Sequence, residues 1–379
     1  MFVYLDNSAT TRVYDEAAKE AVRVMTESYG NPSSLHTAGF DAEKIMTASR
    51  KTVAGAFGAL PEEIYFTSGG TESDNTAIFG AYRARRRAGN GIVTTAVEHP
   101  AVLEAMKRLE GEGAKVTYVG VDDMCRVDPQ EVAQAVDDNT VLISVMTVNN
   151  ETGTIMPIRD IARAKKGALL HTDAVQGFCK VDIRGIGADM ISVSGHKIHA
   201  PKGTGALYVK KGLNITPFIV GGGQEKGMRS GTENTPGIAA LAKAVEIWQK
   251  NDPEAEMERM RRVRDRLLSN IKDSISDIRV NSPEDACPSV LNVSFLGTRG
   301  EVILHTLEGD GIMVSTGSAC SSGKKGGSHV LKAMGLSDEE VTGAVRFSFG
   351  AFNTPEEMDY VADRLKAAVE RFRRLGTFR

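Results

Sequence analysis

Short apolar runs alternate with helix-like stretches between about residue 60 and residue 210. Runs rich in β-branched and aromatic residues predict strands at 64–67, 92–96, 116–121, 141–148, 168–172 and 190–193. The helix-like stretches between them are clearest at 71–84 and 101–111. Because strands that alternate with helices pair mostly in parallel, this region predicts a mostly parallel sheet with helices on both faces. A last run at 204–209 follows a turn and predicts a strand that returns along the sheet.

The pattern changes after the run Gly221-Gly222-Gly223. Long helix-like stretches follow at 238–249 and 254–276, and Asn251-Asp252-Pro253 separates them. Strand-like segments follow at 289–295, 311–315 and 343–349, and a last helix is expected at about 355–373. We expect this C-terminal third to form a smaller α+β domain, with a boundary near residue 250.

Composition excludes several classes of protein. The 379 residues exceed the usual size of one hydrophobic core, and the net charge of -3 does not indicate a nucleic-acid or membrane surface. No segment approaches the ~18 continuous apolar residues of a membrane span, and the N-terminus lacks the basic start of a signal peptide. The four cysteines are widely spaced without a CxxC pair, so we expect no disulfide framework, no metal site and a cytoplasmic location.

Polar and ionisable residues directly follow five of the predicted strands. These segments lie at 68–73, 97–100, 149–151, 173–176 and 194–197. In an open α/β sheet, ligands bind outside the carboxyl ends of the strands. The five segments are therefore expected to line one composite site.

Each part of this site has a chemical interpretation and a plainer alternative. The turn Ser68-Gly69-Gly70-Thr71 offers backbone N–H groups at a helix N-terminus, which favours a phosphate, although such turns are common. Asp173 could pair with a protonated ring nitrogen or cap a helix, and Lys197 could form a Schiff base or lie on the surface. His99 could pack on a planar ring or be an ordinary loop histidine. Together, a phosphate loop, a ring carboxylate and a lysine predict a pyridoxal 5'-phosphate site.

Nine segments of the chain resemble those of class I cysteine desulfurases of the NifS/IscS type, which are pyridoxal phosphate enzymes of fold type I. In chain order they are YLDNSATT (4–11), GNPSSLH (30–36), TSGGTE (67–72), EH (98–99), VNNE (148–151), DAVQ (173–176), SGHK (194–197), RSGTEN (229–234) and GSAC (317–320). The match extends over essentially the whole chain. It implies a large cofactor-binding domain (15–250), with a seven-stranded, mostly parallel sheet between helices. It also implies a small α+β domain (1–14 and 251–379).

The resemblance assigns roles around the cofactor by position. Lys197 would hold pyridoxal phosphate covalently, His99 would stack on its ring, Asp173 would pair with the ring nitrogen, and Gln176 would reach the ring hydroxyl oxygen. The phosphate would be bound by Gly70, Thr71, Ser194 and His196. Thr232 would contribute to the phosphate site of the partner subunit, so the resemblance implies a homodimer.

The resemblance also assigns the substrate, L-cysteine, and the sulfur acceptor, Cys320. Asn150 and Arg346 would hold the substrate carboxylate, and the forked guanidinium of Arg346 suits that role, although the arginine could instead pair with a core acid. Cys320 lies in a small, polar, glycine-rich segment and would become a persulfide as alanine is released. The other cysteines are expected to be structural, namely Cys125, Cys179 and Cys287.

Two classes of alternative remain open. A selenocysteine lyase, or another aminotransferase or lyase of fold type I, would use the same lysine and aspartate without strictly needing Cys320. A platform that carries persulfide to partners would need little turnover of its own. A nucleotide-binding protein is disfavoured, because no complete G-x-x-x-x-G-K-[ST] or G-x-G-x-x-G stands at a strand end. The expected sulfur acceptor is a protein such as an iron–sulfur scaffold or a component of tRNA thiolation.

Overall fold

A seven-stranded sheet forms the centre of the larger part of the molecule in the computed structural model, which describes residues 1–316 and 327–374. The strand order is β2-β8-β7-β6-β5-β3-β4, and β8 alone runs antiparallel to its neighbours β2 and β7. The strands are β2 (Ile64–Thr67), β3 (Gly91–Thr95), β4 (Lys115–Val119), β5 (Thr140–Ser144), β6 (Leu169–Asp173), β7 (Met190–Ser194) and β8 (Gly205–Val209). The predicted fold class is confirmed, including the returning strand at 204–209.

One predicted strand is too long. The run at 141–148 forms β5 only as far as Ser144. The chain still follows β6 beyond that point, because the backbone N–H of Thr147 donates to the carbonyl of Asp173 at 2.8 Å. It then turns back on itself, where Val148 bridges Ile155 in the antiparallel sense. The last residues of this apolar run therefore lie beyond the strand and lead into the polar segment 149–151.

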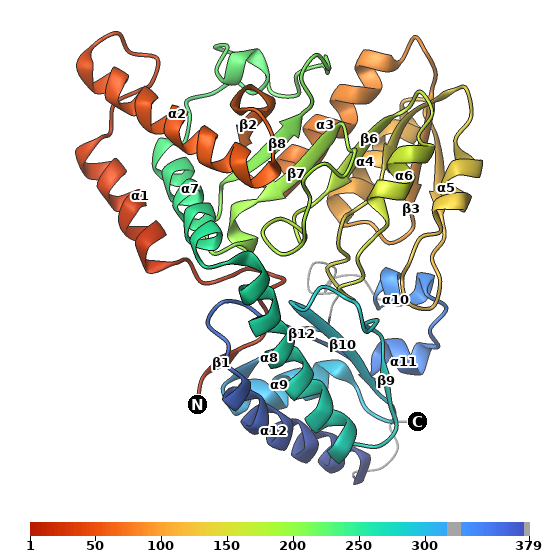
Figure 1. The fold of residues 1–379 in the computed structure, drawn as a ribbon. Helices are drawn as coiled ribbons and strands as arrows, with labels where there is room; N and C mark the ends of the chain where they lie inside the picture. Colours follow the sequence, from red (N-terminus) through yellow and green to blue (C-terminus); the bar gives the residue numbers. More distant parts are fainter. Residues whose placement is uncertain (317–326, 375–379) are drawn as a thin grey trace.

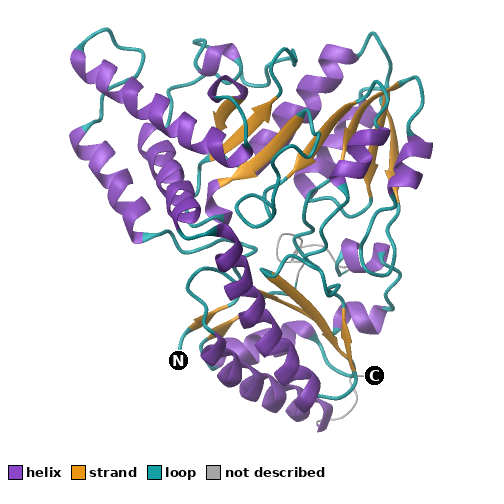
Figure 2. Ribbon diagram, viewed as in Figure 1, coloured by secondary structure: helices purple, strands orange, loops and turns teal. Residues whose placement is uncertain are grey.

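Helices cover both faces of the large sheet (Figure 2), and the side chains of its central strands belong to two separate apolar clusters. Leu142 and Met190 pack with α3 (Gly70–Arg85) and α4 (Pro100–Gly111) on one face. Ile143 and Ile191, the residues that follow them in the chain, pack with the helices of the other face, which are α2 (Thr37–Phe57), α5 (Pro129–Ala135), α6 (Ile158–Ala164) and α7 (Thr235–Lys250). Burial on both faces explains why these strands are continuous apolar runs.

The helices before residue 60 were not predicted. α1 (Asp15–Glu27) and α2 both pack against α7 (Figure 1). α2 begins after His36, whose ring accepts from the N–H of Gly39, and it ends at Gly58 in the left-handed conformation. A glycine with a positive φ commonly ends a helix, so Gly58 is the residue from which the end of α2 could have been predicted.

The smaller part of the molecule is built on a three-stranded antiparallel sheet, in which β10 (Val290–Phe295) lies between β12 (Ala344–Ser348) and β9 (Ile278–Val280). The N-terminal β1 (Val3–Tyr4) pairs with β11 (Ile312–Met313). The remaining elements are α8 (Pro253–Ser274), α9 (Gly300–Gly309), α10 (His329–Ala333), α11 (Asp338–Thr342), α12 (Pro355–Arg374) and the 3-10 turns Pro61–Glu63, Gly195–Lys197 and Glu225–Gly227.

This smaller part has an apolar core of its own. Val3 and Leu5 are buried in it together with residues of α8, α9 and α12, so the first residues of the chain pack with its last third (Figure 1). The predicted division into 15–250 and 1–14 with 251–379 stays a prediction. Among the described residues, no helix combines the length and the apolar character needed to cross a membrane.

Candidate active site

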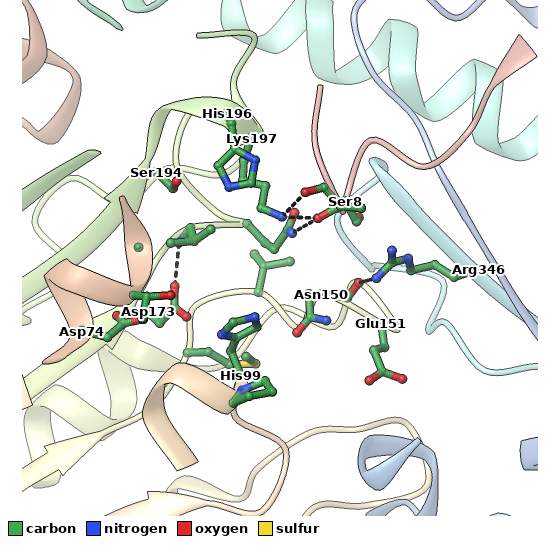
Figure 3. Close-up of a pocket in the computed structure, with 18 of the residues that line it drawn as sticks. Ser8, Asp74, His99, Asn150, Glu151, Asp173, Ser194, His196, Lys197 and Arg346 are labelled. Carbon is green, nitrogen blue, oxygen red and sulfur yellow. Dashed lines mark hydrogen bonds between the residues drawn. The ribbon is translucent and has the colours of Figure 1, made fainter. Parts of the chain in front are cut away.

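A cavity of about 300 Å³ lies at the carboxyl ends of the strands of the large sheet. It is lined by residues that follow β2, β3, β5, β6 and β7, and by residues of the N-terminal segment and β12 (Figure 3). Of the predicted site residues that the structure describes, all line it except Thr232. The five polar strand ends therefore form one site, as the topology of the sheet requires.

Lys197 reaches this cavity from the 3-10 turn that follows β7. Its Nζ donates to the backbone carbonyls of Ser8 and Ala9, the latter at 2.8 Å. The neighbouring His196 lines the same wall, and its Nδ1 lies 3.2 Å from Oγ1 of Thr10. Residues 8–10 therefore contact the lysine and His196 through backbone carbonyl and hydroxyl groups, although they lie near the N-terminus of the chain.

Asp173 is the last residue of β6 and is buried at the floor of the cavity. Its Oδ1 accepts from the backbone N–H of Val175 at 2.8 Å. Burial, together with the nearby carboxyl group of Asp74, raises the pKa of Asp173 to about 8. Oδ1 of Asp74 accepts no hydrogen bond from the described residues and lies 3.5 Å from Nε2 of the buried His171. A cationic group beside Asp173 would offset this cost of burying its carboxylate.

His99 lies across the cavity from Lys197 in Figure 3. It is the N-cap residue of α4, and its Nδ1 accepts from the N–H of Ala101 at 3.1 Å. Burial, followed by the positive charge of Lys197, lowers the pKa of His99 to about 4. The ring is therefore neutral near pH 7, and its orientation is fixed by its own helix.

The N-terminus of α3 faces the cavity through Gly70 and Thr71. A Cβ atom at Gly70 would lie only 2.6 Å from Cγ2 of Val175, so only glycine allows this close approach. Ser194, the last residue of β7, lines the cavity beside this turn. Backbone N–H groups, two hydroxyls and a helix N-terminus form a donor set suited to a phosphate.

Arg346 enters the opposite end of the cavity from β12. Its Nη2 lies 2.8 Å from Oδ1 of Asp6, and its Nη1 donates to the backbone carbonyl of Asn150 at 3.0 Å. Its Nε is buried and has no hydrogen-bond partner among the described residues. The arginine therefore pairs with an acid, as the alternative interpretation expected, and it also lines the cavity.

Cys320 lies outside the described residues, but the chain on either side of its segment is anchored near the cavity. The backbone N–H of Ser315 donates to the carbonyl of Arg346 at 3.1 Å. The hydroxyl of Ser328 donates to Oε2 of Glu151, which lines the cavity. The described residues on both sides of Cys320 therefore contact residues that line the cavity.

The other cysteines and Thr232 lie away from this cavity. All three described cysteines, Cys125, Cys179 and Cys287, are buried, and burial raises the pKa of Cys125 to about 12, so it is a poor thiolate. Thr232 is exposed and does not line the cavity of its own chain. Its predicted role in the site of a partner subunit stays a prediction.

Several residues of the site were not predicted individually. Asp6 and Ser8 belong to the motif YLDNSATT, and Glu151 to VNNE, but only the folded chain gives each a contact. Asp74 carried a local signal, because it lies one helical turn before the buried Ala77 and Ile78 on the sheet-facing side of α3.

Known proteins resemble the chain over almost its whole length. The model of the aminotransferase class-V family matches residues 3–361. Cysteine desulfurase IscS of Clostridium botulinum is 43% identical over 381 residues, which cover 99% of this chain and 96% of that protein. Cysteine desulfurase IscS of Methanosarcina thermophila is 44% identical over 379 residues, covering 99% and 93%.

Two solved structures extend this similarity to the fold. A structure named NifS-like protein superimposes with a TM-score of 0.92 at 39% identity, covering 98% of this chain and 100% of the other. A structure named SspA in complex with cysteine has a TM-score of 0.82 at 34% identity, covering 92% and 98%.

These matches confirm the resemblance that the nine motifs indicated. Class-V aminotransferases and cysteine desulfurases are pyridoxal phosphate enzymes. The chain belongs to the aminotransferase class-V family, within which its relatives are cysteine desulfurases of the IscS and NifS type.

Proposed function

We propose that the chain is a pyridoxal-phosphate-dependent cysteine desulfurase, which converts L-cysteine to L-alanine and carries the sulfur as a persulfide on Cys320. One observation supports this most strongly. A lysine, a buried carboxyl group and a helix N-terminus meet in a single cavity, and an arginine with a buried free donor lies at its other end. The arrangement suits a flat phosphorylated cofactor at one end and an amino-acid carboxylate at the other.

The residues of the cavity fit pyridoxal phosphate. Gly70, Thr71, Ser194 and His196 would hold its phosphate, with Thr232 contributing to the site of a partner subunit in a homodimer. Asp173, whose pKa burial raises to about 8, would pair with the protonated ring nitrogen, and His99 would stack on the ring. When bound, the cofactor would supply the electron sink that makes loss of the substrate Cα proton possible.

Lys197 would both anchor the cofactor and move the substrate proton. The carbonyls of Ser8 and Ala9 hold its Nζ at the wall of the cavity. Once substrate has displaced it, its free amine would take the Cα proton. His99 is neutral near pH 7 and would not repel the positive charge that the lysine then carries.

Arg346 and Asn150 would orient the substrate by its carboxylate. The guanidinium is held by Asp6 and by the backbone of Asn150, so little freedom remains to be lost when substrate binds. Arg346 lines the cavity, so its positive charge would favour a carboxylate there. The side chain of L-cysteine would then project toward the rim from which the segment of Cys320 departs.

Cys320 would take the sulfur as a thiolate. Its attack on the substrate sulfur forms an S–S bond and breaks the C–S bond. The electrons of that bond return to the three-carbon fragment, which takes up a proton and leaves as alanine. The persulfide would then pass to an acceptor protein, such as a scaffold for iron–sulfur cluster assembly. A cytoplasmic location stays a prediction.

The test is turnover by purified protein reconstituted with pyridoxal phosphate. L-cysteine and a reductant should yield alanine and sulfide in equal amounts, and Cys320→Ser should keep the bound cofactor but lose both products. Cys287→Ser is the matched control and should keep activity. Alanine release at the unaltered rate by Cys320→Ser, or turnover of L-selenocysteine but not L-cysteine, would contradict the proposal.

A further inference from the structure

Lys180 is a buried lysine behind Gln176, a residue that lines the active-site cavity, and none of the roles above uses it. It lies in the helical turn that follows β6, and only 9% of its surface is exposed. Burial lowers its pKa from the usual range, whereas the buried thiols of Cys287 and Cys179 act in the opposite direction. No carboxylate of the described residues forms an ion pair with it. Burial of a lysine without an ion-pair partner costs free energy of folding, so its retention here suggests a specific role.

The partner of Lys180 is the side chain of Gln176. Nζ of Lys180 donates to Oε1 of Gln176 at 3.2 Å, and Nε2 of Gln176 donates to the carbonyl of Ser8 at 2.9 Å. That same carbonyl accepts from Nζ of Lys197. A continuous chain of hydrogen bonds therefore runs from Lys180 through Gln176 and Ser8 to Lys197.

The backbone holds Lys180 and Gln176 together. The N–H of Gly177 donates to the carbonyl of Ala174, and the N–H of Lys180 donates to that of Gly177, both at 2.9 Å. In such a turn, residues four apart lie on one face. Cys179 has a φ of 57°, an unfavourable value for a residue with a Cβ, so the chain tolerates local strain immediately before Lys180.

The chemistry of the two groups determines which way the amide of Gln176 points. A carboxamide can present either its oxygen or its NH₂ group to a neighbour, and the two orientations have nearly the same shape. An ammonium group donates three hydrogen bonds and accepts none. The oxygen must therefore face Lys180, and the NH₂ group must face the cavity, where it meets Ser8.

We propose that Lys180 is a positioning residue, which holds the amide of Gln176 so that its NH₂ group points into the cavity as a hydrogen-bond donor. The inference rests on the proposed function, in which that donor meets the ring hydroxyl oxygen of pyridoxal phosphate. Without Lys180, the amide keeps only its contact with the carbonyl of Ser8, so it rotates more easily and can present its oxygen, which would repel the oxygen of the cofactor. Lys180 thus acts on the cofactor through Gln176 and not by direct contact.

The experiment is a titration of the apoprotein with pyridoxal phosphate, followed by visible absorbance. Lys180→Met keeps the length and apolar stem of the side chain and should weaken binding roughly tenfold, as expected for loss of one well-oriented hydrogen bond to a charged group. Lys250→Met removes a positive charge from the exposed end of α7 and should leave binding unchanged.

A double-mutant comparison separates positioning from general damage. Gln176→Ala should weaken binding by itself, and adding Lys180→Met to it should change the Kd by less than about twofold, because the target of the lysine is gone. An undiminished effect of Lys180→Met in the Gln176→Ala protein would overturn the inference. So would unaltered binding by Lys180→Met.

A second variant serves if Lys180→Met does not fold. Lys180→Gln restores a donor, but the new amide can present either its oxygen or its nitrogen to Gln176. Binding of pyridoxal phosphate should therefore still weaken more than threefold. Binding equal to that of the unaltered protein would overturn the inference. If the unaltered protein fails to bind pyridoxal phosphate, the proposed function fails, and this inference fails with it. Tight binding by the unaltered protein and by every variant overturns the inference alone.

Discussion

Nη2 of Arg346 lies 2.8 Å from Oδ1 of Asp6, and this ion pair joins β12 to the segment that follows β1. The arginine side chain is only 4% exposed, so removal of Asp6 would leave a buried positive charge without its carboxylate partner, which is costly. It fixes the guanidinium at the end of the cavity opposite the N-terminus of α3. Asp6 therefore sets the position of the group proposed to bind the substrate carboxylate.

Asp6→Asn should raise the KM for L-cysteine about tenfold, with a much smaller change in kcat, because the weakened contact lets the guanidinium move without altering the reacting atoms. Steady-state kinetics of the reconstituted protein measures both constants. Asp15→Asn breaks an exposed pair with Arg12 and is the matched control. An unchanged or lower KM in Asp6→Asn would show that Asp6 competes with substrate for Arg346.

Lys197→Ala should abolish covalent attachment of pyridoxal phosphate, since Lys197 is the lysine that the described chain places in the cavity beside Asp173. Borohydride reduction followed by mass spectrometry should find the label on Lys197 in the unaltered protein and no label in the variant. Lys202→Ala, a nearby exposed lysine, should be labelled normally. A label on another lysine would refute the assignment.

Glu98 makes the stability of the apoprotein depend on pH. Its carboxyl group is fully buried, and burial is the main cause that raises its pKa to about 8 from its ordinary value of 4.5. The folded protein therefore keeps a proton on Glu98 that the unfolded chain has lost. The stability contributed by this proton is complete below pH 4.5 and is lost as the pH rises toward 8, by at most about 1.4 kcal/mol per pH unit.

Glu98→Gln should remove that part of the pH dependence, because glutamine does not titrate. The measurement is Tm of the apoprotein from pH 5 to pH 8.5, for Glu98→Gln and for the unaltered chain. The Tm of Glu98→Gln should improve relative to that of the unaltered protein as the pH rises. Parallel curves would mean that Glu98 is already ionised in the folded protein at pH 5.

Thr232→Ala should weaken binding of pyridoxal phosphate several-fold and leave binding of pyridoxal, which lacks the phosphate, unchanged. Thr232 is exposed and lies outside the cavity of its own chain, so this effect requires a second copy. Light scattering should accordingly give a dimer. A monomer with full cofactor affinity, or equal losses for both ligands, would count against a shared phosphate site.

The sequence predicts the large sheet and its site well because both depend on short segments. A strand buried on both faces is a continuous apolar run, as in Leu169–Asp173, and the polar residue at its end reaches the ligand edge by topology alone. Asp173 and Lys197 could therefore be chosen before the fold was known.

The rest of the site depends on contacts that no local pattern encodes. Asp6 meets Arg346 across 340 positions of the chain, and Ser8 meets Lys197 across 189. Short strands such as β1 and β9 are defined by their partners and carry too few residues for a period of two. Lys180 appears in the sequence as an ordinary polar residue, and only its burial against Gln176 sets it apart.

The most direct test of the central claim is the mass of the protein after one turnover. Holoenzyme mixed with one equivalent of L-cysteine, without reductant, is digested and examined by mass spectrometry. The account predicts one additional sulfur atom on the peptide that contains Cys320, in step with the alanine released. Alanine release with the added sulfur on Cys125, Cys179 or Cys287, or on no cysteine, would contradict it.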